Sequence, residues 1–292
     1  MLLIDGKTVS NKIKLELEEI IKKDNLTPGL GIILIGDRED SKVYVNMKKK
    51  ACSKIGIRNI DVKLDVDVRE DSLIKEVIRM NENDNIHGIL IQLPLPKHIN
   101  TQNVLSKVSI KKDVDGFHSC SMGNLALNTD SKYFAPCTPE GCMELLRRYK
   151  INVEGKNVVV IGKSNIVGMP LSLMLMNKDA TVTVCHIKTK NLKMHTKNAD
   201  IIFCACGVPN LINKEYLKQD VVIIDIGINK IPINEQHDCK DKKYKIVGDV
   251  DFEDVKEIVS AITPVPGGVG PMTIATLLKH TVEACIEANK EN

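Results

Sequence analysis

Short apolar runs alternate with stretches of helical periodicity along the first third of the chain. The runs are rich in Ile, Leu and Val and end at Gly, Pro or polar residues, as buried parallel strands do. The stretches between them carry apolar positions three or four residues apart, which predicts amphipathic helices. The predicted strands are 29–36, 61–66 and 88–93, and the predicted helices are 41–55 and 71–81.

The alternation stops between residues 106 and 137, which are polar and irregular, and then begins again. A helix is predicted to begin near Thr138, with Thr138 as its N-cap, Pro139 in its first turn and Glu140 close behind. The later pattern predicts strands at 157–162, 181–186, 200–205 and 220–227, a helix at 166–177, a charged loop at 229–245, and a last helix from residue 273 to about residue 289.

Two alternating series joined by an irregular segment predict an α/β protein with two domains and parallel sheets. The sequence contains no repeat of short period and no low-complexity tail. In such proteins, ligands favour the clefts between domains and the carboxyl ends of the strands. These are therefore the places where functional residues are expected.

The composition restricts the class of protein. The 292 residues are sufficient for two domains, and 43% hydrophobic with 27% charged residues is typical of a globular protein. The net charge of +3, without an aromatic platform, argues against nucleic acid as a partner. No apolar run approaches the roughly 20 residues of a membrane span, and the first residues lack the basic region of a signal peptide. A cytoplasmic protein without a membrane partner is expected.

Nine cysteines raise the question of disulfides or a metal site. Cys204 and Cys206 are separated by one residue within an apolar run, which is not the spacing of a C-x-x-C site. Cys137 and Cys142 are separated by four residues, and no second pair follows them. We therefore interpret the cysteines as reduced small hydrophobic residues and expect no metal.

A candidate nucleotide site lies where the strand 157–162 leads into the next helix. Gly162 and Gly168 bracket the turn, with Ser164 between them. The free N–H groups at the start of a helix favour phosphate. The spacing differs from G-x-G-x-x-G, so an ordinary strand-to-helix turn remains an alternative.

The end of the next predicted strand bears on the choice of dinucleotide. NAD-binding folds usually place Asp or Glu there to bind the ribose hydroxyls. Here the strand ends in Cys185, His186, Ile187 and Lys188, and Lys163 lies in the preceding turn. Cationic or neutral groups at these places favour the 2′-phosphate of NADP, although Lys188 alone is also compatible with a solvated surface lysine.

Tyr44 and Lys48 are the first catalytic candidates. They lie one helical turn apart, on one stripe with Ala51 or Cys52 and with Ile55. A phenol and an amine on the inward face of a helix are costly unless they are paired or functional. A lysine near polar groups in a partly dry cleft can act as an acid or a base. The alternative is that Lys48 is one surface lysine of the run 48–50.

Further candidates occur in turns. Gln92 lies in an apolar strand just before Pro94, and its amide needs a partner; it is either functional or a capped edge residue. Asp115, by default part of an Asx-Gly turn, carries a carboxylate that could accept two hydrogen bonds from an aminopyrimidine edge. The segment 263–273 joins Pro and Gly in a stiff loop that can approach a ligand closely and cannot be the interior of a helix or strand.

Together these segments resemble the bifunctional methylenetetrahydrofolate dehydrogenase/cyclohydrolase family. The resemblance covers nearly the whole chain. It is carried by IDGK (4–7), SKVYVNMKKKACSKIGI (41–57), GILIQLPLP (88–96), KDVDGF (112–117), PCTPEG (136–141), IGKSNIVGMP (161–170), DIGIN (225–229), VGDVDF (247–252) and TPVPGGVGPMT (263–273).

The resemblance implies two α/β domains around a cleft. The catalytic, folate-binding domain would comprise 1–137 and 271–292, because the last helix returns to the N-terminal domain. A Rossmann-like NADP-binding domain would comprise 138–270 and pair with its copy in a homodimer. The implied activity is oxidation of methylenetetrahydrofolate with NADP, followed by hydrolysis of the methenyl product to 10-formyltetrahydrofolate.

The resemblance also implies roles for individual residues. Tyr44 and Lys48 would lie at the folate carbon centre, with Gln92 beside Lys48 and Asp115 on the pterin ring. The implied contacts elsewhere are Pro266, Gly267 and Gly268 along the folate, Gly162, Lys163 and Ser164 on the adenosine phosphate side of NADP, and Thr138 and Ile228 along the dinucleotide.

Two positions depart from the family. Arg usually stands where this chain has Lys163, and Ser often stands where it has Ile187; both positions serve the 2′-phosphate. Arg binds phosphate through two parallel hydrogen bonds and Lys does not. NADP is therefore expected to bind less tightly, and NAD is possible. A monofunctional NAD-using dehydrogenase and a catalytically silent nucleotide-sensing protein are the alternative functions.

Overall fold

The computed structural model describes residues 1–129, 131, 133–232 and 244–291. By its contacts the chain divides into two compact units. Unit 1 comprises Met1–Ser10 and Thr138–Thr273, and unit 2 comprises Asn11–Cys137 and Ile274–Asn292. Both units contain parallel sheets and helices, which confirms the predicted α/β class.

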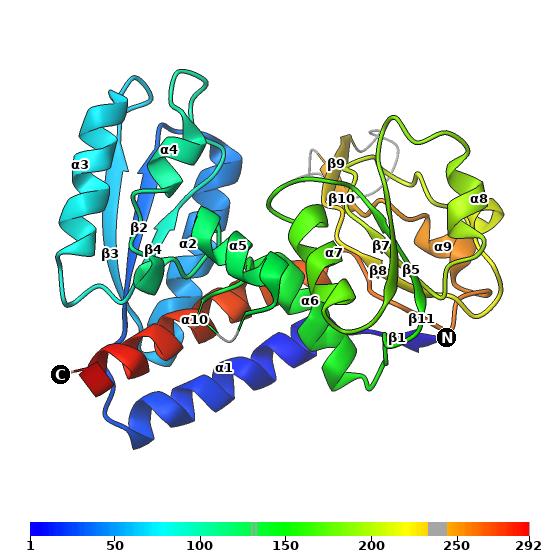
Figure 1. The fold of residues 1–292 in the computed structure, drawn as a ribbon, viewed down its shortest axis with the longest axis horizontal. Coiled ribbons are helices and arrows are strands. Elements are labelled where there is room, and N and C mark those ends of the chain that lie inside the picture. Colours follow the sequence, from blue (N-terminus) through cyan, green and yellow to red (C-terminus); the bar gives the residue numbers. More distant parts are fainter. Residues whose placement is uncertain (130, 132, 233–243, 292) are drawn as a thin grey trace. The chain divides into compact units, whose positions relative to one another are not determined.

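Unit 2 is built on a three-stranded parallel sheet, in the order β3-β2-β4 (Figure 1). The central strand is almost entirely buried because helices cover both of its faces. Ile33 and Ile35 pack against residues of α3, whereas Ile32 and Leu34 face α2. The elements are β2 (Gly29–Ile35), α2 (Glu39–Ile55), β3 (Arg58–Leu64), α3 (Glu70–Asn81), β4 (Gly88–Ile91), α4 (Thr101–Leu105), η1 (Ile110–Lys112) and α5 (Ser119–Leu127).

Unit 1 is built on a six-stranded sheet, in the order β1-β11-β8-β7-β5-β6, and all of its strands are parallel. One cluster of its core consists of aliphatic and cysteine side chains from the central strands and the segments that cover them, and Phe203 on the central strand at 201–204 is also fully buried. The strands are β1 (Leu2–Leu3), β5 (Asn157–Ile161), β6 (Thr181–Cys185), β7 (Ile201–Cys204), β8 (Val222–Asp225) and β11 (Ala261–Ile262).

The remaining elements connect or cover these sheets. They are α1 (Gly6–Lys23), α6 (Cys137–Arg148), α7 (Gly168–Met176), α8 (Leu192–Thr196), η2 (Lys214–Tyr216), β9 (Asn229–Pro232), β10 (Tyr244–Val247), α9 (Phe252–Val255) and α10 (Val269–Glu291). Across the described ranges, none of the helices combines the length and the apolar character needed to cross a membrane.

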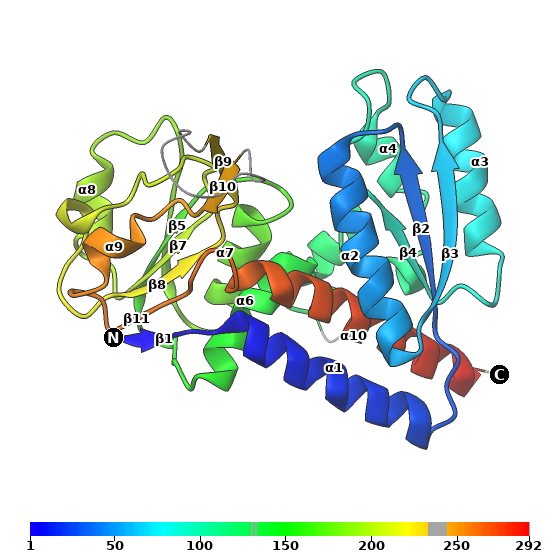
Figure 2. The ribbon, with the colours of Figure 1, turned by 180° about the vertical axis from the view of Figure 1, so that it is seen from behind.

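The first ten residues depart from the predicted domain boundaries. They belong to unit 1, because Leu2 pairs with Ala261 and Leu3 with Ile262 in a parallel ladder (Figure 2). The N–H of Ile4 extends this contact by donating to the carbonyl of Ile262 at 2.8 Å. A strand of two residues carries no periodic signal, and its partner lies at the opposite end of the sequence, so the pattern could not reveal the pairing.

Two secondary-structure predictions were wrong, and one long helix was missed. Residues 106–137 are not irregular throughout, since they contain α5. The predicted loop 229–245 contains β9 and β10, which pair antiparallel; its residues 233–243 lie outside the described part. The charged residues of these short strands concealed their alternation. The helix α1 was also not predicted, although its apolar positions recur at helical spacing.

The two helix starts also differ from prediction. The helix α6 begins at Cys137, so Thr138 lies in its first turn rather than at the N-cap. The helix α10 begins at Val269, so the last part of segment 263–273 is helical. Pro271 is compatible with this because the first N–H groups of a helix have no partner within the helix.

Candidate active site

Lys48 and Gln92 form the centre of the candidate site in unit 2. The Lys48 side chain, on α2, is buried, and its Nζ donates a hydrogen bond to Gln92 Oε1 at 3.2 Å. Gln92 follows β4, where its backbone N–H donates to the carbonyl of Ile33. Its Nε2 donates to the carbonyl of Leu93 at 2.8 Å, which leaves Oε1 facing the lysine. The structure thus brings these two predicted residues together.

Tyr44 lies at the margin of the buried face of α2, with 37% of its surface exposed. The prediction of an inward-facing stripe was therefore wrong for Tyr44. Partial burial of the phenol, with a contribution from the charge of Asp40, raises the pKa of Tyr44. Its hydroxyl consequently stays protonated and able to donate a hydrogen bond. The buried residues of α2 are Ser41, Val45, Lys48, Cys52 and Ile55.

Asp115 shares an electrostatic environment with Lys48. Burial raises the pKa of the Asp115 carboxyl, and the positive charge of Lys48 opposes that shift most strongly. A hydrogen bond from Cys137 and the charge of His280 oppose it further. Lys48, Gln92 and Asp115 therefore belong to one polar group within unit 2.

Two side chains hold the backbone beside Asp115. The carbonyl of Val114 accepts a hydrogen bond from His280 Nδ1 at 2.8 Å and another from Cys137 Sγ at 3.3 Å. His280 lies on α10 and is 1% exposed. Because both donors are buried, the peptide that precedes Asp115 has a defined position.

Asp113 fixes the backbone on the other side of Asp115. Its carboxylate accepts hydrogen bonds from the N–H groups of Phe117 and His118 and from Ser121 Oγ, at 2.8–3.1 Å. Burial raises the pKa of Asp113 to about 6. Sequence reasoning missed Asp113, although the two aspartates of the KDVDGF segment could have indicated it. It also missed His280, for which the sequence offered no signal.

Gly116 completes this turn. It has a φ of +73°, and a Cβ atom at this position would lie 2.3 Å from the carbonyl carbon of Ala135. Both facts exclude a larger residue. The turn that carries Asp115 is therefore set by backbone geometry as well as by hydrogen bonds.

The predicted nucleotide turn follows β5 in unit 1. Gly162 has a φ of +129°, and a Cβ atom there would lie 2.2 Å from the carbonyl oxygen of Ala205. Ser164 Oγ accepts a hydrogen bond from the N–H of Val167 at 3.2 Å. The Lys163 and Ser164 side chains are both exposed. The turn thus presents a backbone cradle with a cation and a hydroxyl beside it.

The turn after β6 lies next to the nucleotide turn, since the Gly162 N–H donates to the Cys185 carbonyl at 2.8 Å. Two hydrogen bonds between His186 and Thr189 close it: Thr189 N–H to the His186 carbonyl, and His186 N–H to Thr189 Oγ1. Ile187 projects from this turn and is 95% exposed. An apolar side chain with this exposure offers no donor to a phosphate.

The other predicted cofactor residues are also in unit 1. Ile228 follows β8 and is 46% exposed. Thr138 Oγ1 forms a 2.9 Å hydrogen bond with Thr273 Oγ1, which joins the beginnings of α6 and α10. These residues lie at the ends of separate elements of unit 1.

Pro266, Gly267 and Gly268, predicted to line the folate, belong to unit 1 rather than to unit 2. The carbonyl of Gly267 accepts a hydrogen bond from the N–H of Lys7 at 2.8 Å. The structure gathers Lys48, Gln92 and Asp115 within unit 2 and places this loop in the other unit. Within the described part of the chain, no group of three or more His, Cys, Asp or Glu residues could hold a metal ion.

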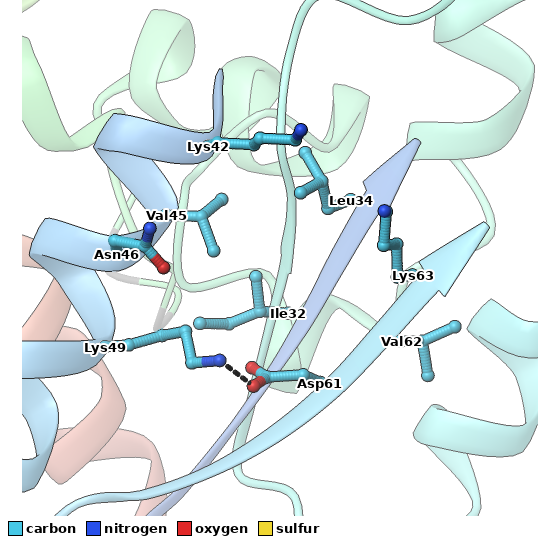
Figure 3. A pocket seen from close by; sticks show the side chains of 9 residues that line it. All are labelled: Ile32, Leu34, Lys42, Val45, Asn46, Lys49, Asp61, Val62 and Lys63. Atoms are coloured by element: carbon cyan, nitrogen blue, oxygen red, sulfur yellow. Dashed lines mark ion pairs between the residues drawn. The ribbon is translucent and has the colours of Figure 1, made fainter. Parts of the chain in front are cut away.

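A pocket of about 260 Å³ lies between α2 and the strands β2 and β3 (Figure 3). It contains no predicted site residue. Its lysines are paired: Lys49 with Asp61, and Lys42 and Lys63 with Asp37. Because these ion pairs neutralise the lysines, the pocket is not a candidate for the active site. The lining residues are Ile32, Leu34, Lys42, Val45, Asn46, Lys49, Asp61, Val62 and Lys63.

Comparison with known families matches both parts of the chain. Residues 4–115 match the catalytic domain of tetrahydrofolate dehydrogenase/cyclohydrolase, and residues 136–289 match its NAD(P)-binding domain. The chain belongs to the tetrahydrofolate dehydrogenase/cyclohydrolase family. Membership confirms the resemblance inferred from the sequence segments.

Individual members of the tetrahydrofolate dehydrogenase/cyclohydrolase family match over nearly the full length. The bifunctional protein FolD of Nautilia profundicola is 49% identical, with 100% of this chain and 99% of the relative covered. The crystal structure of the bifunctional enzyme FolD from Campylobacter jejuni has a TM-score of 0.92 and 46% identity, covering 98% of this chain and 99% of that one. The Trypanosoma brucei enzyme, complexed with NADP and an inhibitor, has a TM-score of 0.92, 37% identity and 99% coverage of both chains.

Proposed function

We infer that the chain oxidises 5,10-methylenetetrahydrofolate to 5,10-methenyltetrahydrofolate with NADP and hydrolyses the product to 10-formyltetrahydrofolate. The observation that carries this inference is the hydrogen bond from the buried Lys48 to Gln92, in the unit that matches the family's catalytic domain. The hydrolysis requires a group that can handle protons beside a carbon centre, and a buried lysine held by a neutral amide provides one. The oxidation transfers only a hydride, and for this step the unit has to position the folate carbon.

Lys48 is proposed to manage protons in the hydrolysis. Water adds to the methenyl carbon and must lose a proton, and the ring then opens as one nitrogen becomes protonated. The nitrogen of a neutral lysine amine carries a lone pair. That amine can accept the proton from water. Gln92 Oε1 keeps the Lys48 nitrogen in place during both transfers.

Asp115 is proposed to bind the pterin ring. A carboxylate can accept two N–H bonds from an aminopyrimidine edge, and such charge-assisted bonds are stronger than neutral ones. The rigid backbone around Asp115 supports this role, because a carboxylate that does not need to be ordered binds with less loss of entropy. Tyr44, one turn before Lys48 on α2, is proposed to contact the folate near the same carbon.

The residues of unit 1 fit a dinucleotide. Bound NADP supplies the hydride acceptor for the oxidation. The Gly162 turn would hold the phosphates through its N–H groups, with Lys163 and Ser164 beside them. Ile228 and Thr138 would lie along the dinucleotide. Lys163 and Ile187 would bind the 2′-phosphate less tightly than Arg and Ser, so NAD is proposed as a weaker alternative.

The proposed function is tested by absorbance assays on the purified chain. Methylenetetrahydrofolate is supplied with NADP or NAD, and methenyltetrahydrofolate is supplied without a dinucleotide. Reduction of NADP together with hydrolysis of the methenyl compound supports the bifunctional enzyme. Reduction of NAD without hydrolysis would instead support a monofunctional dehydrogenase, and no absorbance change in any assay would contradict catalysis.

We also propose that the enzyme is a cytoplasmic homodimer that pairs through unit 1. The strand β6 ends the six-stranded sheet, and its Val184 is 36% exposed, so this edge is available for a second copy. Eight cysteines in the described part are free thiols, which favours a reducing compartment. Light scattering after size exclusion would test the dimer, and fractionation of tagged cells would test the location.

A further inference from the structure

Two buried aspartates in unit 1 are not among the residues proposed to contact the folate or the dinucleotide. Asp225 ends β8 and is 3% exposed, and Asp249 lies between β10 and α9 and is fully buried. Among the described residues, their carboxylates accept hydrogen bonds from backbone N–H groups, an amide and a thiol, and from no lysine or arginine. Buried carboxylates held in this way have a defined position and impose it on the backbone they contact.

Asp225 binds the segment that contains Asp249. Asp225 Oδ1 accepts hydrogen bonds from the N–H of Gly227 at 2.9 Å and of Asp249 at 3.1 Å. Its Oδ2 accepts one from the N–H of Val250 at 2.9 Å. The carboxylate therefore joins the turn after β8 to the turn before α9.

Asp249 binds the turn after β7 and the segment after β8. Its Oδ2 accepts hydrogen bonds from the N–H groups of Cys206 at 2.7 Å and Gly207 at 3.1 Å. Its Oδ1 accepts one from Asn229 Nδ2 at 2.8 Å. A single carboxylate thus connects residues from two different strand ends.

The two carboxylates interlock through glycines. A Cβ atom at Gly248 would lie 1.9 Å from Asp225 Oδ2, and a Cβ atom at Gly227 would lie 2.3 Å from Asp249 Oδ1. The Asp225 carboxylate therefore fills the space that a side chain at Gly248 would need. The Asp249 carboxylate does the same at Gly227. This mutual fit restricts both turns to one arrangement.

The turns held in this way are the ones proposed to face the dinucleotide. Ala205 precedes Cys206 in the turn after β7. A Cβ atom at Gly162 would lie 2.2 Å from the Ala205 carbonyl oxygen, so Ala205 is in contact with the proposed phosphate turn. Ile228 lies between Gly227 and Asn229, which are both hydrogen-bonded to the pair. The position of Ile228 and of the wall beside Gly162 thus depends on the two aspartates.

We propose that Asp225 and Asp249 are positioning residues for dinucleotide binding, which hold the turns after β7 and β8 against the cofactor without touching it. This inference rests on the proposed NADP-dependent function. It predicts that a disturbed pair weakens dinucleotide binding and leaves the dinucleotide-independent hydrolysis of methenyltetrahydrofolate intact.

The test uses Asn229 and Asp249 as a reciprocal pair in the full-length protein. Asn229→Asp places a second carboxylate against Asp249 Oδ1, and we expect the KM for NADP to rise about tenfold through this repulsion. In Asp249→Asn the Asn229 amide can rotate by half a turn and keep a hydrogen bond with residue 249, so a smaller rise in the KM for NADP is expected. The combination of both substitutions restores a donor opposite an acceptor and should return the KM for NADP to within about threefold of the wild type.

Asp249→Ala is the severe variant, and Glu257→Gln, at an exposed position near α9, is the matched control. Binding of NADP, measured by calorimetry, and methenyl hydrolysis are recorded for every variant. Equal losses in binding and hydrolysis, an unchanged KM for NADP in Asn229→Asp, or no recovery in the double variant would overturn the inference. If Asp249→Ala does not fold, the comparison of Asn229→Asp with the double variant tests the inference. If the wild type binds NADP without reducing it, the proposed function fails while the binding comparison still tests the positioning role.

Discussion

Each unit uses a buried aspartate to hold a turn that carries a proposed ligand contact. In unit 2, the hydrogen bonds that Asp113 accepts from described residues come from four, five and eight positions away, and the turn it closes carries Asp115. In unit 1, Asp225 reaches a segment 24 and 25 positions away, and it needs Asp249 as a second carboxylate to reach the turn after β7. In unit 2 one carboxylate fixes a turn formed by neighbouring residues. In unit 1 two carboxylates, hydrogen-bonded in series, are needed to join strand ends that are distant in the sequence.

The units also differ in what they present to a ligand. Unit 2 offers charged side chains, Lys48 and Asp115, held in partly buried positions. Unit 1 offers the backbone at Gly162, with exposed side chains such as Lys163 beside it. Hydrolysis at a folate carbon needs a group that moves protons, whereas oriented backbone N–H groups can bind phosphate. The following substitutions test this division.

The largest effect is expected for Lys48→Met, which keeps the volume of the side chain and removes its amine. Hydrolysis of methenyltetrahydrofolate should fall by about 10²- to 10⁴-fold, the usual contribution of a general acid or base. Lys50→Met, at an exposed position on the same helix, is the control. The initial rate of loss of methenyl absorbance measures both. Hydrolysis by Lys48→Met at the wild-type rate would mean that the proposed proton transfers do not involve this residue.

The second prediction concerns the replacement of two crowded glycines, Gly116 and Gly162, by alanine. Gly116→Ala should raise the KM for the folate substrate about tenfold and spare NADP binding, and Gly162→Ala should do the reverse, since each added Cβ meets a carbonyl group. Gly155→Ala is the control, because Gly155 has a φ of +67° but open space around its Cβ position. It should lower stability by about 1 kcal/mol and leave both binding constants unchanged. If both variants lose the same ligand, the division between the units is wrong.

The third prediction concerns the dinucleotide. Lys163→Arg combined with Ile187→Ser adds a bidentate donor and a hydroxyl, and the ratio of kcat/KM for NADP to that for NAD should rise about tenfold. Lys190→Arg, at an exposed position beyond the same turn, controls for a general effect of arginine. The ratio is measured with saturating methylenetetrahydrofolate. A ratio that does not rise would place the 2′-phosphate away from these two residues.

The smallest effects are expected in the pH dependence of stability. Burial raises the pKa of Asp113 to about 6 and that of Asp225 to about 7, above the value near 4 of an unfolded aspartate. The folded chain thus keeps protons that the unfolded chain releases. The resulting stabilisation is complete below about pH 4 and is lost as the pH rises through about 6 for Asp113 and about 7 for Asp225.

Calorimetric melting between pH 5 and pH 8 measures this dependence. The Tm of the wild type should fall by a few degrees over this range, and the Tm of Asp225→Asn should not show this fall. The pH dependence of Tm in Asp113→Asn should differ from that of the wild type mainly below pH 6. Asp84→Asn, at an exposed position, should follow the wild type. Parallel curves for all four proteins would show that neither buried aspartate takes up a proton in this range.

Much of the fold could be predicted because buried strands carry their own signal. The apolar runs at Gly29–Ile35 and Asn157–Ile161 identified two strands, and the alternation with helices identified parallel sheets. The helix α5 was missed because its small and polar residues form only a weak apolar stripe. The strand β1 was missed because it is short and its pairing partner lies at the opposite end of the sequence. The strand β9 was missed because it is short and its charged residues conceal the alternation.

The candidate site was predictable only where the sequence itself groups its residues. Tyr44 and Lys48 are one helical turn apart, and the spacing correctly placed Lys48 on the buried face of α2. It misplaced Tyr44, because the position of a residue at the edge of a stripe depends on what packs beside the helix. His280 lies 166 positions from Val114, and no local pattern could connect them.

The sequence by itself determined the α/β class and, through its ordered segments, the family, and it indicated candidate residues for moving protons and binding phosphate. Periodicity and turn chemistry act over a few residues, so a linear pattern can express them. The tertiary structure alone decided that Gln92 holds Lys48, that His280 clamps the backbone beside Asp115, and that Asp249 ties together the turns after two strands. These contacts follow from the packing of distant elements, and each buried polar group has to find its partner wherever the fold brings one within reach.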